Sequence, residues 1–273
     1  MSNVKAQNSK ELSELPTLES SVDSYHLEDH LGGNGPSIKV LVFGGLDGIL
    51  SMFATVFGCA GASISPVQTI CVSIGSLVAS AFSMGYGEYV SEIAERDYMN
   101  SELRREQIEV EEKPECEKKE MYDIYTGRYN FSDEDARSLV DIAFRNKEFF
   151  LRHMMVEELG IMLTDQEITP VRRGILMFCS FCVLGAIPML GFIGFYIGES
   201  GSRLSKIMGY GTTSFFSLVA TMALGYFKGS YMKQNPIQSA MKMTFNGIVV
   251  GASSYLMGYL VTLMFPEGEP ITP

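Results

Sequence analysis

The chain has 273 residues, of which 46% are hydrophobic, and its 21 basic and 32 acidic side chains give a formal net charge of -11. The charges are concentrated in residues 92–167, where acids outnumber bases about two to one, and the flanking sequence is apolar. This separation excludes a simple soluble globule. The acidic balance excludes a nucleic-acid partner, which requires a basic face.

Five apolar stretches are each long enough to cross a bilayer, because a helix rises about 1.5 Å per residue and the hydrocarbon core is about 30 Å thick. They are residues 38–64, 67–90, 174–197, 204–227 and 237–265. Glycine and serine are frequent in all five, which lets helix backbones approach closely in lipid. Pro188 predicts a kink in the third stretch. These features predict an all-α integral membrane protein with five transmembrane helices.

The charged block between the second and third stretches is predicted to be helical. The second apolar helix can continue through residues 91–112, Pro114 is typical of the first turn of a new helix, and Ser132 with Asp135 resembles a capping box. We therefore expect the following organisation: residues 1–36 as a flexible cytosolic tail, 37–90 as transmembrane helices 1 and 2, 91–169 as an inserted cytosolic three-helix acidic metal-binding domain, 170–266 as transmembrane helices 3–5, and 267–273 as a short lumenal tail.

Basic residues predict the orientation of the spans. Most lie after span 2, before span 3 and between spans 4 and 5, namely Arg96, Arg104, Arg105, Arg172, Arg173, Lys228 and Lys233. The opposite turns carry only Arg203 and Lys206. By the positive-inside rule the first group is cytosolic, which also places the N-terminus in the cytosol.

Two carboxylates fall within the apolar stretches, where an ionised group is costly and usually functional. Asp47 lies about nine residues into the first stretch, and the alternative is a carboxylic acid held by the Ser51 hydroxyl. Glu88 lies near the cytosolic end of the second stretch and could also be an ordinary helix-end carboxylate. Met84 stands one turn before Glu88, on the same face. A thioether beside a carboxylate suits a borderline ion such as Fe²⁺, although methionine in an apolar helix more often only packs.

The charged block offers several acidic helix faces. Glu102, Glu106 and Glu109 repeat at helical spacing, as do Glu117 and Glu120, and Glu158 follows Met154 and Met155 by one turn. Three such faces could gather carboxylates around cations, as in helix-bundle metal sites. The alternative is a set of solvated surfaces. His153 is a possible ligand, but a lone histidine is more often structural.

The sequence has no Walker A loop, no G-x-S-x-G motif and no zinc signature, so we expect neither an enzyme nor an organic cofactor. Cys179 and Cys182 have the spacing of a metal knuckle but lie in an apolar stretch, where small buried residues are the better interpretation.

Several of these motifs together resemble the vacuolar iron transporter family over residues 37–265. The matching segments are Asp47-Gly48, Ser83-Met84, Gly87-Glu88, Glu117-x-x-Glu120-Met121 with Ile124-Tyr125, and Met154-Met155-Val156-Glu157-Glu158-Leu159-Gly160. The last run is the most specific, and the five-span layout with an acidic insertion agrees.

The resemblance implies a homodimeric Fe²⁺/H⁺ antiporter that loads a vacuole or similar acidic store from the cytosol. It implies an intramembrane ion site at Asp47 and Met84, with Glu88 on the ion pathway. It also implies a cytosolic metal site formed by Glu106, Glu109, Glu117, Glu120, Met154, Met155 and Glu158. Mn²⁺, Co²⁺ and Zn²⁺ could use the same ligands. The alternative class is a membrane-anchored iron sensor or ferroxidase without transport, although Glu-x-x-His pairs typical of ferroxidases are absent from these helices.

Overall fold

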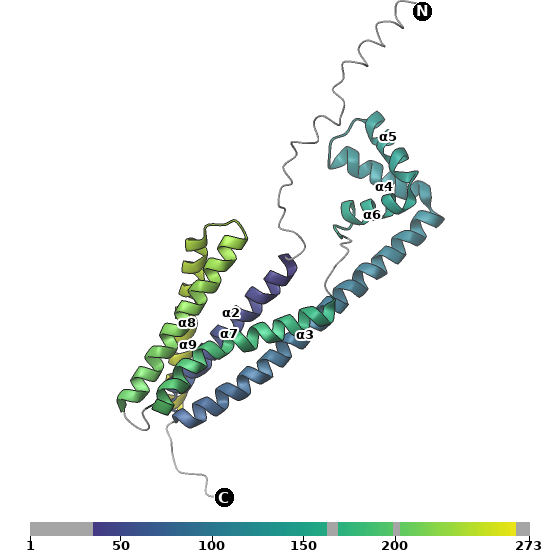
Figure 1. The fold of residues 1–273 in the computed structure, drawn as a ribbon. Coiled ribbons are helices and arrows are strands. Elements are labelled where there is room, and N and C mark those ends of the chain that lie inside the picture. Colours follow the sequence, from purple (N-terminus) through teal and green to yellow (C-terminus); the bar gives the residue numbers. More distant parts are fainter. Residues whose placement is uncertain (1–34, 163–168, 199–202, 266–273) are drawn as a thin grey trace, which may run out of the picture. The chain divides into compact units, whose positions relative to one another are not determined.

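The computed structural model describes residues 35–162, 169–198 and 203–265, and every regular element among them is an α-helix (Figure 1). The helices are α2 (Gly35–Gly61), α3 (Pro66–Glu112), α4 (Pro114–Gly127), α5 (Asp133–Phe144), α6 (Lys147–Glu157), α7 (Pro170–Gly198), α8 (Arg203–Tyr231) and α9 (Pro236–Met264). The predicted tails, apart from Gly35 and Pro36 at the start of α2, lie outside the described residues.

Within the described ranges, five helices are long and apolar enough to cross a membrane, namely α2, α3, α7, α8 and α9. This confirms the predicted five candidate spans. α3 is a single helix of 47 residues, so the apolar stretch continues without interruption into the charged block, as predicted (Figure 1). Helix α7 runs through Pro188, and the kink expected there stays a prediction.

Local sequence signals fix the helix boundaries. Ser65 and Gln68 form a capping box at the start of α3, with Pro66 in the first turn. Pro114 allows α4 to begin directly after α3, separated only by Lys113. The Ser132 side chain accepts a hydrogen bond from the Asp135 backbone N–H at 3.2 Å and caps α5, as the sequence predicts.

Glycines lie where the apolar helices pack most closely. A Cβ atom on Gly48 of α2 would lie 2.5 Å from the Phe181 carbonyl oxygen of α7, and one on Gly85 of α3 would lie 2.9 Å from the Gly174 carbonyl oxygen. A Cβ on Gly258 of α9 would lie 2.2 Å from the carbonyl oxygen of Gly58 in α2. Side chains are therefore excluded at these crossings. Gly194 of α7, in contrast, has open space around the position of an added Cβ.

A buried ion pair joins α3 to the start of α7. Glu92 is 3% exposed, and its carboxylate accepts a hydrogen bond from Arg173 and contacts Arg96 at 3.3 Å. Glu92 lies directly after the apolar part of α3. An ionised carboxylate is costly to bury unless it is paired, so the contacts with Arg173 and Arg96 stabilise the buried position of Glu92.

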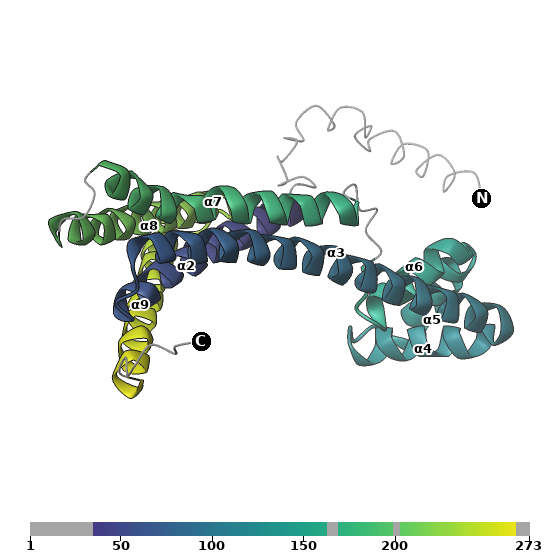
Figure 2. The same ribbon diagram turned by 90° about the horizontal axis from the view of Figure 1, so that it is seen from below.

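The three short helices gather at the end of α3 (Figure 2), and the four helices share an apolar core. Its buried members come from all four helices and are Val110, Met121, Tyr125, Ala136, Val140, Ala143, Phe150 and Met154. Lys118 lies over the Phe144 ring at 4.5 Å from its centre. This core fixes the ends of α3, α4 and α6 relative to one another.

Gly48→Ala is expected to lower the stability of the full-length protein by about 1–3 kcal/mol, because the new methyl group meets backbone atoms that cannot move aside. Thermal unfolding in detergent measures the effect. Gly87→Ala in α3 is the matched control, since nothing lies within 4 Å of its added Cβ. An unfolding temperature for Gly48→Ala equal to that of the control would contradict the close crossing.

Candidate metal site

Five glutamates from three helices converge beside this core. Glu106 and Glu109 belong to α3, Glu117 and Glu120 to α4, and Glu158 caps the C-terminal end of α6. They form two groups that share Glu117. One is Glu106, Glu109 and Glu117, the other is Glu117, Glu120 and Glu158, and within each group the carboxylate oxygens lie within 4.8 Å of one another.

The convergence follows from the helix geometry. Residues three apart on a helix lie on one face, which pairs Glu106 with Glu109 and Glu117 with Glu120. The break at Lys113 and Pro114 turns the chain so that the two faces meet. Oxygens bound to one small divalent ion at about 2.1 Å lie at most about 4.2 Å apart. A small contraction of either group would therefore suffice to hold a cation.

Burial makes the cluster unlike an ordinary acidic surface. Glu106 is 1% exposed and Glu117 is 3% exposed. The Oε2 atom of Glu117 is buried and has no hydrogen-bond partner within the described structure. A buried carboxylate oxygen without a partner costs free energy that a cation, a proton or a water would recover.

Burial, together with the charges of neighbouring carboxylates, raises the proton affinity of two of these glutamates. Burial, followed by the negative charges of Glu120 and Glu106, raises the pKa of Glu117 to about 7. The pKa of Glu158 also rises to about 7, first through desolvation and then through the charges of Glu106 and Glu120. Near neutral pH the metal-free cluster therefore holds protons that a divalent ion would displace.

Arg105 supplies the cation nearest to Glu106. Its Nη2 atom lies 2.9 Å from a carboxylate oxygen of Glu106 and 2.9 Å from one of Glu102. Glu102 belongs to the predicted acidic face but lies in neither of the two groups. The acidic face was predicted from the sequence, but the contact of Arg105 with its glutamates was not, although Arg105 is adjacent to Glu106 in the chain.

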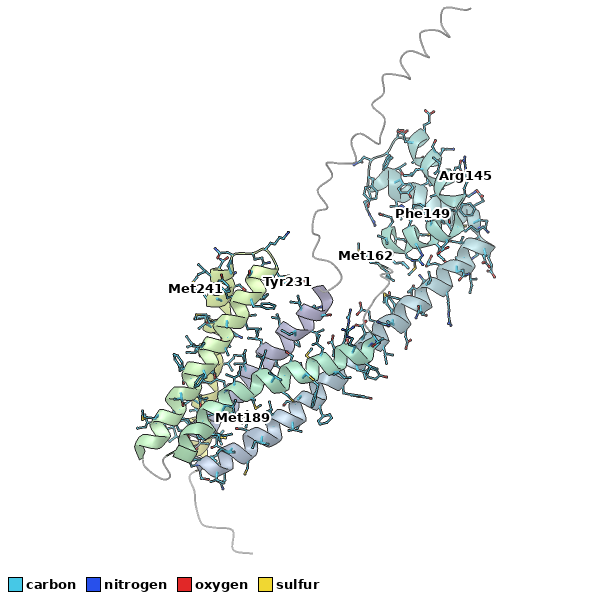
Figure 3. All side chains as sticks on the ribbon, in the orientation of Figure 1. Arg145, Phe149, Met162, Met189, Tyr231 and Met241 are labelled. Atoms are coloured by element: carbon cyan, nitrogen blue, oxygen red, sulfur yellow. The ribbon has the colours of Figure 1, made fainter. Side chains whose placement is uncertain are left out.

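The two methionines differ in their surroundings. Met154 is fully buried in the apolar core, which supports a packing role for its side chain. Met155 is also fully buried and precedes Glu158 by three residues. His153 stacks on Tyr125 and Phe149, with ring centres 6.0 Å and 5.5 Å apart, so its ring packs between aromatic groups (Figure 3 labels Phe149).

Glu157, beside Glu158, belongs to a different contact. Its carboxylate accepts a hydrogen bond from the Tyr129 hydroxyl at 2.6 Å and lies 3.7 Å from Arg128. These contacts join the end of α6 to the turn after α4. They hold in place the helix end that carries Glu158.

Asp47 and Met84, the candidate ion ligands within the apolar region, lie on α2 and α3, and both of these helices pack on α7. Asp47 is half-buried, and Ser51 one turn later hydrogen-bonds its carboxylate. Its neighbour Gly48 packs on Phe181, whereas Gly85, the neighbour of Met84, packs on Phe178. These two α7 positions are about 4.5 Å apart along the helix axis. Asp47 and Met84 therefore lie at similar depths.

Glu88 extends the Met84 face toward the charged half of α3. Met84, Glu88 and Glu92 repeat every four residues, so they share one side of the helix. Met84 and Glu88 are half-buried, and Glu92 is buried in its ion pair. Glu92 is not among the residues predicted from the sequence. Its position directly after the apolar stretch, one turn beyond Glu88, was the signal.

Five apolar helices of membrane-spanning length, with a carboxylate cluster carried beyond them on α3, define a multi-pass membrane protein with a candidate cation site. The profile of the VIT family matches residues 38–259, and the chain belongs to that family. A Toxoplasma gondii protein named Vacuolar iron transporter is 46% identical over 239 residues, which cover 88% of this chain and 79% of the relative.

More distant proteins align over similar lengths. A Vacuolar iron transporter of Plasmodium falciparum is 43% identical over 246 residues, covering 88% of this chain and 89% of the relative. Vacuolar iron transporter 1 of Arabidopsis thaliana is 26% identical over 237 residues, covering 87% and 90%. These alignments confirm the family resemblance seen in the sequence.

The proton held by Glu117 should make the stability of the folded protein depend on pH. Glu117 keeps its proton up to about pH 7 in the folded protein but has a pKa near 4.5 when unfolded, so the folded state binds more protons between these values. Its contribution to stability is therefore present below about pH 4.5 and is lost as the pH rises through about 7. We expect the unfolding temperature of wild type, relative to Glu117→Gln, to fall between about pH 5 and pH 8 in chelator. A constant difference would contradict the raised pKa.

Glu117→Gln should affect the metal-free and metal-bound proteins in opposite directions. Above about pH 7 it removes a repelled charge and raises the unfolding temperature in chelator, whereas it lowers the affinity for Fe²⁺ at least about tenfold. Anaerobic titration of the full-length protein in detergent measures the affinity. Glu111→Gln is the control, because Glu111 is exposed and lies about 200° around α3 from Glu109. Unchanged Fe²⁺ affinity in Glu117→Gln would reduce the cluster to a structural feature.

Proposed function

We propose that the protein transports Fe²⁺ from the cytosol into a vacuole or similar acidic store, in exchange for protons. The single observation that carries the proposal is the pair of glutamate groups that share buried Glu117, whose Oε2 atom has no hydrogen-bond partner within the described structure. Two members of these groups, Glu106 and Glu109, lie on α3, the helix that also crosses the apolar region. Membership of the VIT family and the name of the relatives, Vacuolar iron transporter, support iron as the transported substrate.

The carboxylate cluster would collect the ion on the cytosolic side. Carboxylates raise the local concentration of cations, and Met155 offers a softer ligand beside Glu158 that suits Fe²⁺. The basic residues near α3, α7 and the α8–α9 turn support a cytosolic position for this side, with a cytosolic tail before α2 and a short lumenal tail after α9. Residues 91–169 would then form a cytosolic metal-binding domain of a non-enzymatic transporter.

Asp47 and Met84 would form the ion site within the membrane, with Glu88 toward its cytosolic side. Ionised Asp47 binds the metal and protonated Asp47 releases it, so metal and protons compete for one carboxylate. An acidic lumen favours protonation and release, which couples the two movements in opposite directions. Mn²⁺, Co²⁺ and Zn²⁺ could use the same ligands.

A homodimer would complete the ion pathway. The side of α2 that carries half-buried Asp47 also carries Phe43, which is 56% exposed and lies one turn earlier. A large aromatic side chain and an internal carboxylate on one incompletely covered face suit contact with a second copy. The two copies of α2 would then line the pathway between the subunits.

Asp47→Asn is expected to abolish proton-coupled Fe²⁺ uptake while leaving Fe²⁺ binding at the Glu117 cluster unchanged. Wild-type protein in proteoliposomes should take up Fe²⁺ faster with an acidic interior, and the interior should become more alkaline as iron enters. An iron-sensitive dye and a pH dye inside the vesicles measure both. Asp141→Asn is the control, since Asp141 is exposed on α5, outside the cluster.

Wild-type rates in Asp47→Asn would refute the role of this carboxylate. Iron entry that ignores the pH gradient would replace the antiporter with a passive channel. Tight Fe²⁺ binding without any entry would favour the alternative function, a membrane-anchored sensor or ferroxidase.

A further inference from the structure

A cavity of about 300 Å³ lies where α8 turns into α9. Lys228 from the last turn of α8 and Lys242 from the second turn of α9 both line it. Figure 3 labels Tyr231 near the end of α8 and Met241 near the start of α9, which locates this end of the helix pair. Leu46 of α2 and Met243 of α9 contribute apolar wall. None of the residues that line the cavity belongs to the Glu117 cluster.

The cavity carries positive charge without a counter-ion. Neither Lys228 nor Lys242 forms an ion pair within the described part of the chain. Helices α7, α8 and α9 contain no aspartate or glutamate in their sequences, and Asp47 is the only acid in α2. Two lysines at one cavity in so weakly acidic a neighbourhood favour an anionic ligand.

Side-chain amides complete the lining and add hydrogen-bond donors. Gln238, Lys242 and Asn246 repeat every four residues and form a polar stripe along one side of the first half of α9. The Asn235 side-chain oxygen accepts hydrogen bonds from the backbone N–H groups of Ile237 and Gln238, at 3.1 Å and 3.3 Å. Its NH₂ group is therefore the part left to serve a ligand at the cavity.

We propose that this cavity binds a phosphate group. A phosphate presents several acceptor oxygens with negative charge, which matches two lysine ammonium groups and neutral amide donors. The volume is at the lower end of the range of ligand pockets and exceeds what a single small anion needs. Basic pockets between membrane helices are a known setting for anionic lipid headgroups, and soluble phosphate offers the same chemistry.

A phosphate bound in this cavity would lie close to Asp47. Leu46, which lines the cavity, is the residue before Asp47. A phosphate at Lys228 and Lys242 would offset positive charge close to the one internal carboxylate of α2. The binding site does not depend on the transport proposal, because its ligand would bind whether or not iron crosses the membrane.

Binding can be measured on the full-length protein in detergent with two probes. Dioctanoyl phosphatidylinositol 4-phosphate tests the lipid source, and inorganic phosphate tests the soluble source. We expect at least one probe to raise the unfolding temperature and to remain bound in native mass spectrometry. Lys228→Gln and Lys242→Gln should each weaken that binding about tenfold, because each removes a charge-assisted hydrogen bond. Dioctanoyl phosphatidylcholine is the zwitterionic comparison.

Lys233→Asn is the matched control. Lys233 lies in the same turn and carries the same charge but does not line the cavity, and asparagine tolerates its left-handed backbone, with φ of 51°. Binding in this variant should stay within about twofold of wild type. Fe²⁺ affinity at the Glu117 cluster should be unchanged in all three variants, which verifies that they fold.

The results distinguish a lipid headgroup from soluble phosphate as the ligand, and some of them would contradict the proposed site. Binding of the phosphoinositide alone assigns a lipid headgroup, and binding of inorganic phosphate at the same lysines assigns a soluble anion. Equal loss in Lys233→Asn would mean diffuse attraction to a basic surface and would overturn the proposal. Absence of binding by both probes, or equal binding of phosphatidylcholine, would overturn it as well.

Discussion

Repulsion among carboxylates is the constraint around which the charged part of this molecule is built. Like charges a few ångströms apart in a partly buried site repel strongly, and desolvation increases the cost. Protons on Glu117 and Glu158, together with the Arg105 guanidinium on Glu106, reduce that repulsion in the absence of metal. The apolar core beside the cluster supplies the compensating stability. A bound divalent ion would displace these protons and neutralise the carboxylate charges directly.

The long helix α3 connects this site with the apolar region. Met84 and Glu106 lie on the same uninterrupted helix, and their separation of 22 positions corresponds to about 33 Å of axial rise. The Glu92–Arg173 pair and the close approach at Gly85 attach the middle of α3 to α7. The distance between Met84 and Glu106 is therefore fixed by the geometry of one continuous helix, because no flexible linker separates them.

Much of the architecture could be predicted because it depends on local properties. Apolar length determines the candidate spans, and Pro114 and Ser132 mark helix starts that the structure has at the expected places. The acidic faces could also be predicted from the spacing of glutamates. Their meeting at Glu117 could only be suggested, because it depends on how α3, α4 and α6 pack.

Details that depend on tertiary packing could not be obtained from spacing. Glu102 shares the helical face of Glu106, yet Arg105 binds it and it lies outside the two groups. Met154 and Met155 are adjacent in sequence, but only Met154 belongs to the apolar core. In the sequence Glu92 is one more acid in an acidic segment. Its partner Arg173 lies 81 positions later in the chain, so spacing alone does not reveal the pair. In each case the surroundings of the side chain depend on tertiary packing or on an adjacent charged residue, and the spacing of residues along a helix reports neither.

The basic cavity at the α8–α9 turn raises an electrostatic question for a cation pathway, since Lys228 and Lys242 would oppose a divalent ion that approaches Asp47. In water this opposition is screened over about 10 Å at moderate salt, and the charge of half-buried Lys228 is screened less than that of exposed Lys242. A phosphate in the cavity would neutralise the lysines where they stand and remove the opposing field. The acidic cluster and the basic cavity are therefore compatible within one transporter when each holds its own counter-charge, a cation in the first and an anion in the second.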